Sequence, residues 1–143
     1  MTIDEIYINE SIRIRKTYLK NLLKIVESEE EIKNNVKHIE DIKKEIDRYK
    51  EEDINIDEKK ISSTILEINK NIDIIKKNIM PYSDSIKKLD EDQRILYNNI
   101  KDKYPGISRE EIQSQILPHI IPIDNQFRKE NAKLYEKIMN KEE

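Results

Sequence analysis

The chain has 143 residues, of which 40% are charged and 36% are hydrophobic, and its formal net charge is −3. This length corresponds to one domain, and the small net charge together with the frequent isoleucines excludes the profile of a disordered chain. There is no cysteine and only one glycine, Gly106. Disulfides, thiolate metal sites and glycine-rich loops that bind nucleotide phosphates are therefore excluded.

The composition also bears on where the protein is found. No stretch approaches the ~20 apolar residues of a membrane-spanning helix, and residues 1–15 lack the apolar core of a signal peptide. We expect a soluble, intracellular protein that needs no oxidising compartment and has no membrane partner. Heavy use of Ile, Lys and Asn with a single alanine is typical of an AT-rich genome, including those of phages and large DNA viruses. A host cytoplasm or a virion is the expected setting.

Apolar residues recur at helical spacing from Ile12 to Tyr49, which predicts a first long helix over about residues 10–49. A charged, Asx-rich segment follows at about residues 50–57, and it contains neither glycine nor proline. We predict a turn there, with Asp57 as the N-cap of the next helix.

The second helix, predicted over about residues 57–103, has the clearest pattern in the chain. Its first six isoleucines are spaced 4, 3, 4, 3 and 4 residues apart, a heptad with isoleucine at both seam positions. The same register continues to the end of the helix. The predicted seam residues are Ile61, Ile65, Ile68, Ile72, Ile75, Ile79, Ile86, Leu89, Leu96 and Ile100.

Pro81 lies inside this register. A proline in a helix interior removes one hydrogen bond and clashes with the preceding turn. A helix that restarted after Pro81 would have no reason to keep the upstream phase, so the preserved phase favours one kinked helix. The alternative is a true turn at residues 80–83 with Pro81 as the first helical residue.

Tyr104-Pro105-Gly106 is expected to end the second helix, and Ser108 and Glu111 then have the spacing of a capping box. We predict a short helix that Pro118 stops, and an extended segment from Pro118 to Ile123. Asp124 or Asn125 would cap a last helix that ends near residue 140. The residues expected on the inner face of that helix are Phe127, Leu134, Tyr135 and Ile138.

The predicted fold is all-α: residues 1–104 form an elongated antiparallel helical hairpin or coiled coil, and residues 105–143 form short helices that pack back or onto a partner. Isoleucine at both seam positions shifts parallel coiled coils from dimers toward trimers or tetramers. Four bulky residues lie beside the seam: Leu66, Ile74, Met80 and Ile95. Either residues 107–138 or another chain would cover them, and the pattern leaves both alternatives open.

Candidate chemistry is sparse. The two histidines, His38 and His119, lack the converging ligands of a metal site, and carboxylates on long helices are expected to face water. We therefore predict no catalytic, cofactor or metal site, and no enzymatic activity. Residues 104–123, which hold three of the four prolines, are a candidate recognition element, or else a packed connector.

The sequence thus favours a non-enzymatic structural or adaptor protein that acts through helix-mediated self- or hetero-assembly, such as a homo-oligomer or a component of a phage or viral particle. The alternative is a small nucleic-acid-binding or regulatory factor. Four basic residues spaced 3, 4 and 4 apart would form one stripe on the first helix, along which a phosphate backbone could lie. These residues are Arg13, Lys16, Lys20 and Lys24.

Overall fold

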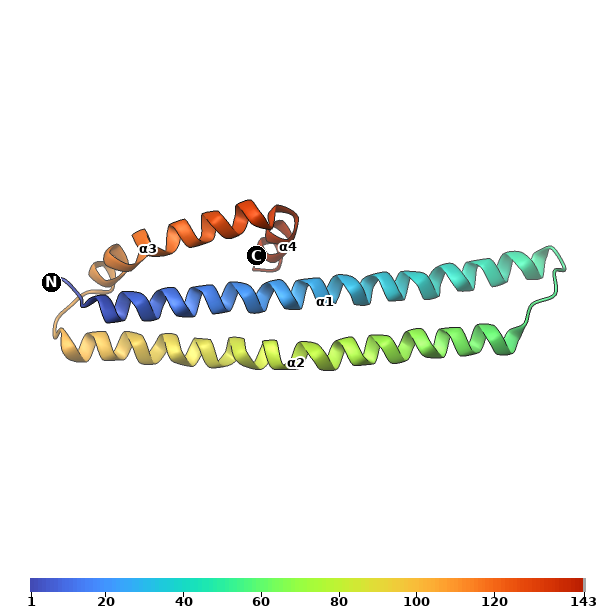
Figure 1. Ribbon diagram of the computed structural model, residues 1–143, viewed down its shortest axis with the longest axis horizontal. Coiled ribbons are helices and arrows are strands. Elements are labelled where there is room, and N and C mark those ends of the chain that lie inside the picture. The colour runs from blue at the N-terminus through green and yellow to red at the C-terminus, as the bar shows by residue number, and fades with distance from the viewer. Residues whose placement is uncertain (143) are drawn as a thin grey trace. The chain divides into compact units, whose positions relative to one another are not determined.

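The computed structural model describes residues 1–142, apart from the side chains of residues 138, 139, 141 and 142. The elements are α1 (Glu5–Glu51), α2 (Glu58–Lys103), α3 (Arg109–Glu130) and α4 (Ala132–Glu142), with no strand among the described residues (Figure 1). The prediction of an all-α fold based on a helical hairpin is confirmed. The predicted inward position of Ile138 lies outside the described side chains.

The two long helices are antiparallel and contribute to two compact units. Unit 1 comprises Met1–Val26 and Pro81–Glu143, and unit 2 comprises Glu27–Met80. In unit 1, Arg13 contacts Asp92 and Asn21 contacts Ser85, while in unit 2 Asn35 contacts Asn71. The partner's residue number falls as the α1 residue number rises, which is the signature of an antiparallel pair.

Helix α1 begins at Glu5, five residues before the expected boundary near residue 10. Contacts with the core stabilise this additional turn, because Tyr7 and Ile8 lie against the core of unit 1. At its other end α1 closes with a Schellman motif. The amide of Ile54 donates to the carbonyl of Tyr49 at 2.9 Å, and Asp53 takes the left-handed conformation, with φ 55°.

Helix α2 starts as predicted, because the Asp57 carboxylate accepts the amide of Lys60 at 3.1 Å. It then runs through Pro81 without interruption, so the chain has one continuous helix here and no turn at residues 80–83. The kink at Pro81 stays a prediction. Pro81 and Lys77, whose carbonyl loses its amide partner, are both exposed. Water can therefore hydrogen-bond the freed carbonyl, and the seam packs on the opposite face.

The connector after α2 is a turn in which the amide of Ile107 donates to the carbonyl of Tyr104 at 3.1 Å. Gly106, with φ 85°, occupies the position of a type II turn that favours glycine, and Pro105 precedes it. The predicted capping box at Ser108 is present: its hydroxyl accepts the amide of Glu111 at 3.1 Å.

The predicted stop at Pro118 and the extended segment Pro118–Ile123 are wrong. Helix α3 continues through both Pro118 and Pro122 to Glu130. Ser114, Pro118 and Pro122 lie four residues apart on one exposed face, so the carbonyls that lose an amide partner face solvent. Ile112 packs on the other side of the helix, where its side chain is fully buried.

The predicted cap at Asp124 or Asn125 is also wrong, because both residues lie inside α3. The break falls at Asn131, whose amide donates to the carbonyl of Phe127 at 2.9 Å and whose backbone leaves the helical region, with φ −131° and ψ 44°. Phe127 and Tyr135 face each other across this break, with ring centroids 6.2 Å apart. Their contact joins α3 to α4.

The core of unit 1 lies where α1, the C-terminal part of α2 and α3 meet. Its buried residues come from all three helices and from the segments that flank them: Ile3, Ile14, Leu89, Leu96, Ile100, Ile107 and Ile112. Ile100 and Ile112 have no exposed surface. Residues 105–130 therefore pack back onto the hairpin within unit 1.

The N-terminal residues of unit 1 are held by hydrogen bonds that join distant parts of the sequence. The amide of Ile3 donates to Oε1 of Gln115, and Nε2 of Gln115 donates to the carbonyl of Met1, both at 2.7 Å. The amide of Asp4 donates to the Tyr104 hydroxyl at 2.9 Å, and its carboxylate pairs with Lys103. The hydrogen bond from Lys103 lowers the pKa of Asp4 below its ordinary value.

Candidate assembly surface

The predicted seam faces inward in both units, but it is covered unequally. In unit 1, Leu89, Leu96 and Ile100 are buried and Ile86 is half-buried. In unit 2 only Ile72 and Ile75 are buried. The remaining seam residues of that unit are half-buried: Ile61, Ile65, Ile68 and Ile79. The core of unit 1 includes residues of α3, whereas unit 2 contains only segments of α1 and α2, so the inequality follows from the number of helices.

The α1 side of unit 2 shows the same deficit. Val36 is exposed, and no residue from 27 to 51 is buried. Its other apolar residues are all half-buried: Ile32, Ile39, Ile42, Ile46 and Tyr49. A pair of helices can bury only one stripe on each, and the stripes of this pair are not sealed from water.

Three bulky residues of α2 in unit 2 are more exposed still. Leu66 and Ile74 each keep 57% of their surface exposed, and Met80 keeps 60%. Ile95, in unit 1, is exposed as well. Within unit 1, the described residues of α3 therefore leave Ile95 uncovered.

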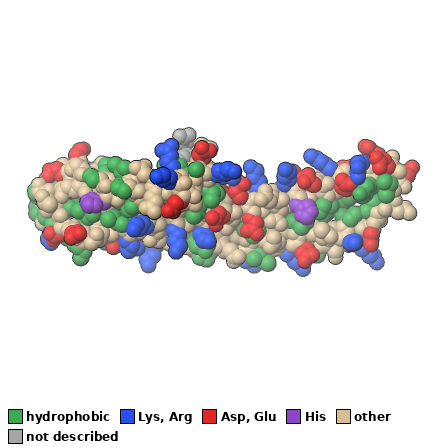
Figure 2. Space-filling view, turned by 45° about the horizontal axis from the view of Figure 1, so that its top comes forward, with side chains coloured by type: hydrophobic (Ala, Val, Ile, Leu, Met, Phe, Trp, Pro, Cys, Tyr) green, Lys and Arg blue, Asp and Glu red, His purple; other side chains and the backbone are tan. Residues whose placement is uncertain are grey.

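A groove of about 420 Å³ lies between α1 and α2 of unit 2. Asn35 and His38 line it from α1, and Ile68, Asn71 and Ile74 are among the residues that line it from α2. The two asparagine amides form a hydrogen bond of 3.4 Å. Hydrophobic side chains reach the surface beside each of the two histidines in the view of Figure 2. Thr64, Glu67 and Lys70 complete the lining, so two isoleucines lie among polar and charged side chains.

All four residues of the predicted basic stripe on α1 are exposed: Arg13, Lys16, Lys20 and Lys24. The Arg13 guanidinium forms ion pairs with Glu10 and, at 3.1 Å, with Asp92 of α2, and these acceptors raise its pKa above the ordinary range. Lys16 and Lys20 also line a pocket whose other residues include Ile123 and Phe127 of α3. The nucleic-acid alternative stays a prediction without a supporting contact.

Residues 104–123, the predicted recognition element, form the turn after α2 and the first part of α3. Ile107 and Ile112 are buried in this segment, whereas Leu117 and Ile121 are exposed, so both interpretations stay open. His38 and His119 are both exposed. Among the described residues, no group of three or more His, Cys, Asp or Glu side chains could hold a metal ion.

Within the described residues, no helix is long and apolar enough to span a membrane. A comparison of the chain with protein-family models, with curated proteins and with solved structures found no match.

Proposed function

We propose that the chain is a non-enzymatic structural or adaptor protein that assembles through unit 2, and that its partner there is a second copy of the same hairpin. The observation that supports this proposal is the exposure of Leu66, Ile74 and Met80 beside an incompletely buried seam. Full burial of a side chain of this size contributes about 1.5–3 kcal/mol, so covering three half-exposed ones provides a substantial driving force.

Charge supports a second copy as the partner. Residues 27–51 of α1 contain nine acidic and six basic residues, whereas residues 58–80 of α2 contain three acidic and five basic residues. The two helices of unit 2 therefore have net charges of opposite sign. In a two-fold pair of hairpins, α1 of one copy would face α2 of the other, and both contacts would be electrostatically complementary.

The setting we propose is intracellular, in a cytoplasm or in a particle assembled there, because the chain has no cysteine and a composition typical of AT-rich genomes. In such a setting the protein would act by joining helices of separate chains, and its function would depend on the surface of unit 2.

The proposal is tested by measuring mass with size-exclusion chromatography and light scattering over a range of concentrations. One chain has a mass of 17.2 kDa, and we expect at least twice this value for the wild type. Ile74→Lys should reduce the mass to that of one chain while helicity is retained. Ile95→Lys is the matched control, because it makes the same change at an exposed position of the same helix in unit 1.

Two results would contradict the proposal. The first is a wild-type protein that stays at the mass of a single chain at every concentration. The second is an oligomer that Ile74→Lys and Ile95→Lys weaken to the same extent, since assembly would then not depend on the surface of unit 2.

A further inference from the structure

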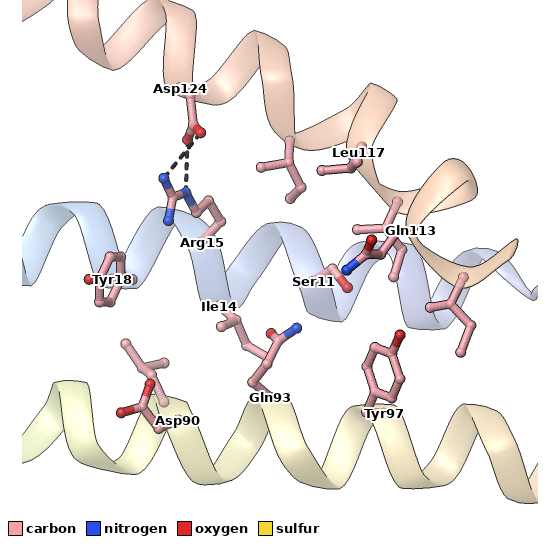
Figure 3. Close-up of a pocket in the computed structure, with 14 residues that line it drawn as sticks. Ser11, Ile14, Arg15, Tyr18, Asp90, Gln93, Tyr97, Gln113, Leu117 and Asp124 are labelled. Atoms are coloured by element: carbon pink, nitrogen blue, oxygen red, sulfur yellow. Dashed lines mark hydrogen bonds and ion pairs between the residues drawn. The ribbon is translucent and has the colours of Figure 1, made fainter. Parts of the chain in front are cut away.

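Unit 1 contains a cleft of about 490 Å³ that is lined by all three of its long helical segments (Figure 3). Its apolar lining includes Ile14 of α1, Leu89 of α2 and Ile112 of α3, each of which is buried. Ile116 adds a half-buried side chain from α3. Cavities that bind small molecules have volumes of about 300–1,000 Å³ and mainly apolar walls, so both size and lining fit a ligand site.

One polar group in this cleft has no partner. Ser11 is 4% exposed, and its hydroxyl has no hydrogen bond within the described structure. Burying a hydroxyl without a hydrogen bond is unfavourable, so the binding of a molecule that supplies the bond is favoured. Ser11 of α1 and Gln113 of α3 both line the cleft (Figure 3), and Gln113 is exposed. Because Ser11 is among the lining residues, a ligand in the cleft would lie beside it.

The charges in the cleft indicate what kind of molecule fits. Arg15 is the only cationic residue that lines it, and its guanidinium donates to both carboxylate oxygens of Asp124, at 2.8 and 3.1 Å. The cleft therefore offers no cation for an anionic ligand, while Asp90 would repel one. The remaining polar groups at the rim, including the exposed Gln93 amide, are neutral.

We infer that this cleft binds a small, uncharged, mainly aliphatic molecule with a hydroxyl or carbonyl group that hydrogen-bonds to Ser11. The apolar part would contact Ile14, Leu89 and Ile116, and the polar group would restore the missing hydrogen bond. This inference goes beyond assembly, and it involves unit 1 alone. The two proposals can therefore fail separately.

The experiment uses the full chain and the uncharged fluorescent probe N-phenyl-1-naphthylamine, with 1-octanol and octanoate as competitors. We expect saturable binding of the probe and its displacement by 1-octanol, with octanoate at least tenfold weaker. Ser11→Ala should weaken the binding of 1-octanol about three- to tenfold, which corresponds to the loss of one hydrogen bond. The affinity for the probe should be unchanged. Ser63→Ala, at an exposed position in unit 2, is the control and should change neither.

A second pair of variants tests the location. Ile116→Trp should fill the cleft and weaken the probe at least tenfold, whereas Ile95→Trp, at an exposed position outside the cleft, should not. Circular dichroism establishes whether each variant is folded. If Ile116→Trp does not fold, Ser11→Ala alone tests whether the ligand binds in this cleft. The inference is overturned if the wild type binds no probe, if octanoate competes as well as 1-octanol, or if Ser11→Ala leaves 1-octanol binding unchanged.

Discussion

The burial of Ile112 gives the sharpest test of the packing in unit 1. Its side chain is fully buried in the core cluster that α1, α2 and α3 share. Ile112→Ala removes three carbons, and at about 0.8 kcal/mol per buried methylene their transfer is worth about 2.4 kcal/mol. A cavity that does not collapse adds up to about 2 kcal/mol. We therefore expect the free energy of unfolding to fall by about 2–4 kcal/mol.

Ile121→Ala is the matched control. It makes the same substitution in the same helix, but Ile121 is 52% exposed. Only about half of the free energy of transferring the three carbons from water is lost, and no cavity forms. We therefore expect the free energy of unfolding to fall by about 1 kcal/mol.

Urea denaturation followed by tyrosine fluorescence suits this measurement, because six of the seven tyrosines lie in unit 1. The slope of the transition should be equal in both variants, so that the shift in midpoint reports stability alone. Equal losses in Ile112→Ala and Ile121→Ala would refute the reasoning, since they would mean that Ile112 is no better covered than a surface residue.

Three other substitutions have defined outcomes. Pro81→Ala should raise the urea midpoint, because alanine restores the missing hydrogen bond, with a gain of up to about 3 kcal/mol; a lower midpoint would mean that the helix needs its proline. Ser108→Ala should cost about 1 kcal/mol by removing the N-cap of α3, and no loss of stability would contradict the observed capping box. The pKa of Asp4 is lowered by Lys103, so its contribution to stability is present at neutral pH and is lost as the pH falls below about 4. The melting temperature of the wild type should therefore fall more on acidification than that of Asp4→Asn, and parallel curves would exclude this contribution.

Local features of the sequence predicted much of the fold. The seam from Ile61 to Ile100 is inward-facing along its length, the phase across Pro81 indicated an uninterrupted α2, and the caps at Asp57 and Ser108 are present. Each of these depends on residues within a few positions of one another. A helix brings such residues together whatever surrounds it, so the sequence pattern is sufficient to predict these features.

The prolines of α3 show where local reasoning fails. A proline ends a helix when nothing offsets the free energy of the lost hydrogen bond. In a continuing helix, water hydrates the freed carbonyl on one face, and packing of the other face stabilises the helix. Pro118 and Pro122 lie on a solvated face opposite the buried Ile112. Only the packing of α3 against unit 1 decides which face is solvated, and no pattern within residues 109–130 contains that information.

The candidate sites divide in the same way. The sequence by itself determined which residues form the seam, because spacing sets the face of a helix, and it identified Leu66, Ile74 and Met80 as lying beside that seam. Tertiary structure alone decided how many helices cover each part of the seam, that Arg15 pairs with Asp124, and that the Ser11 hydroxyl is buried without a partner. The physical reason is distance along the chain: these features depend on residues up to about a hundred positions apart, whose meeting is fixed by packing rather than by helical periodicity.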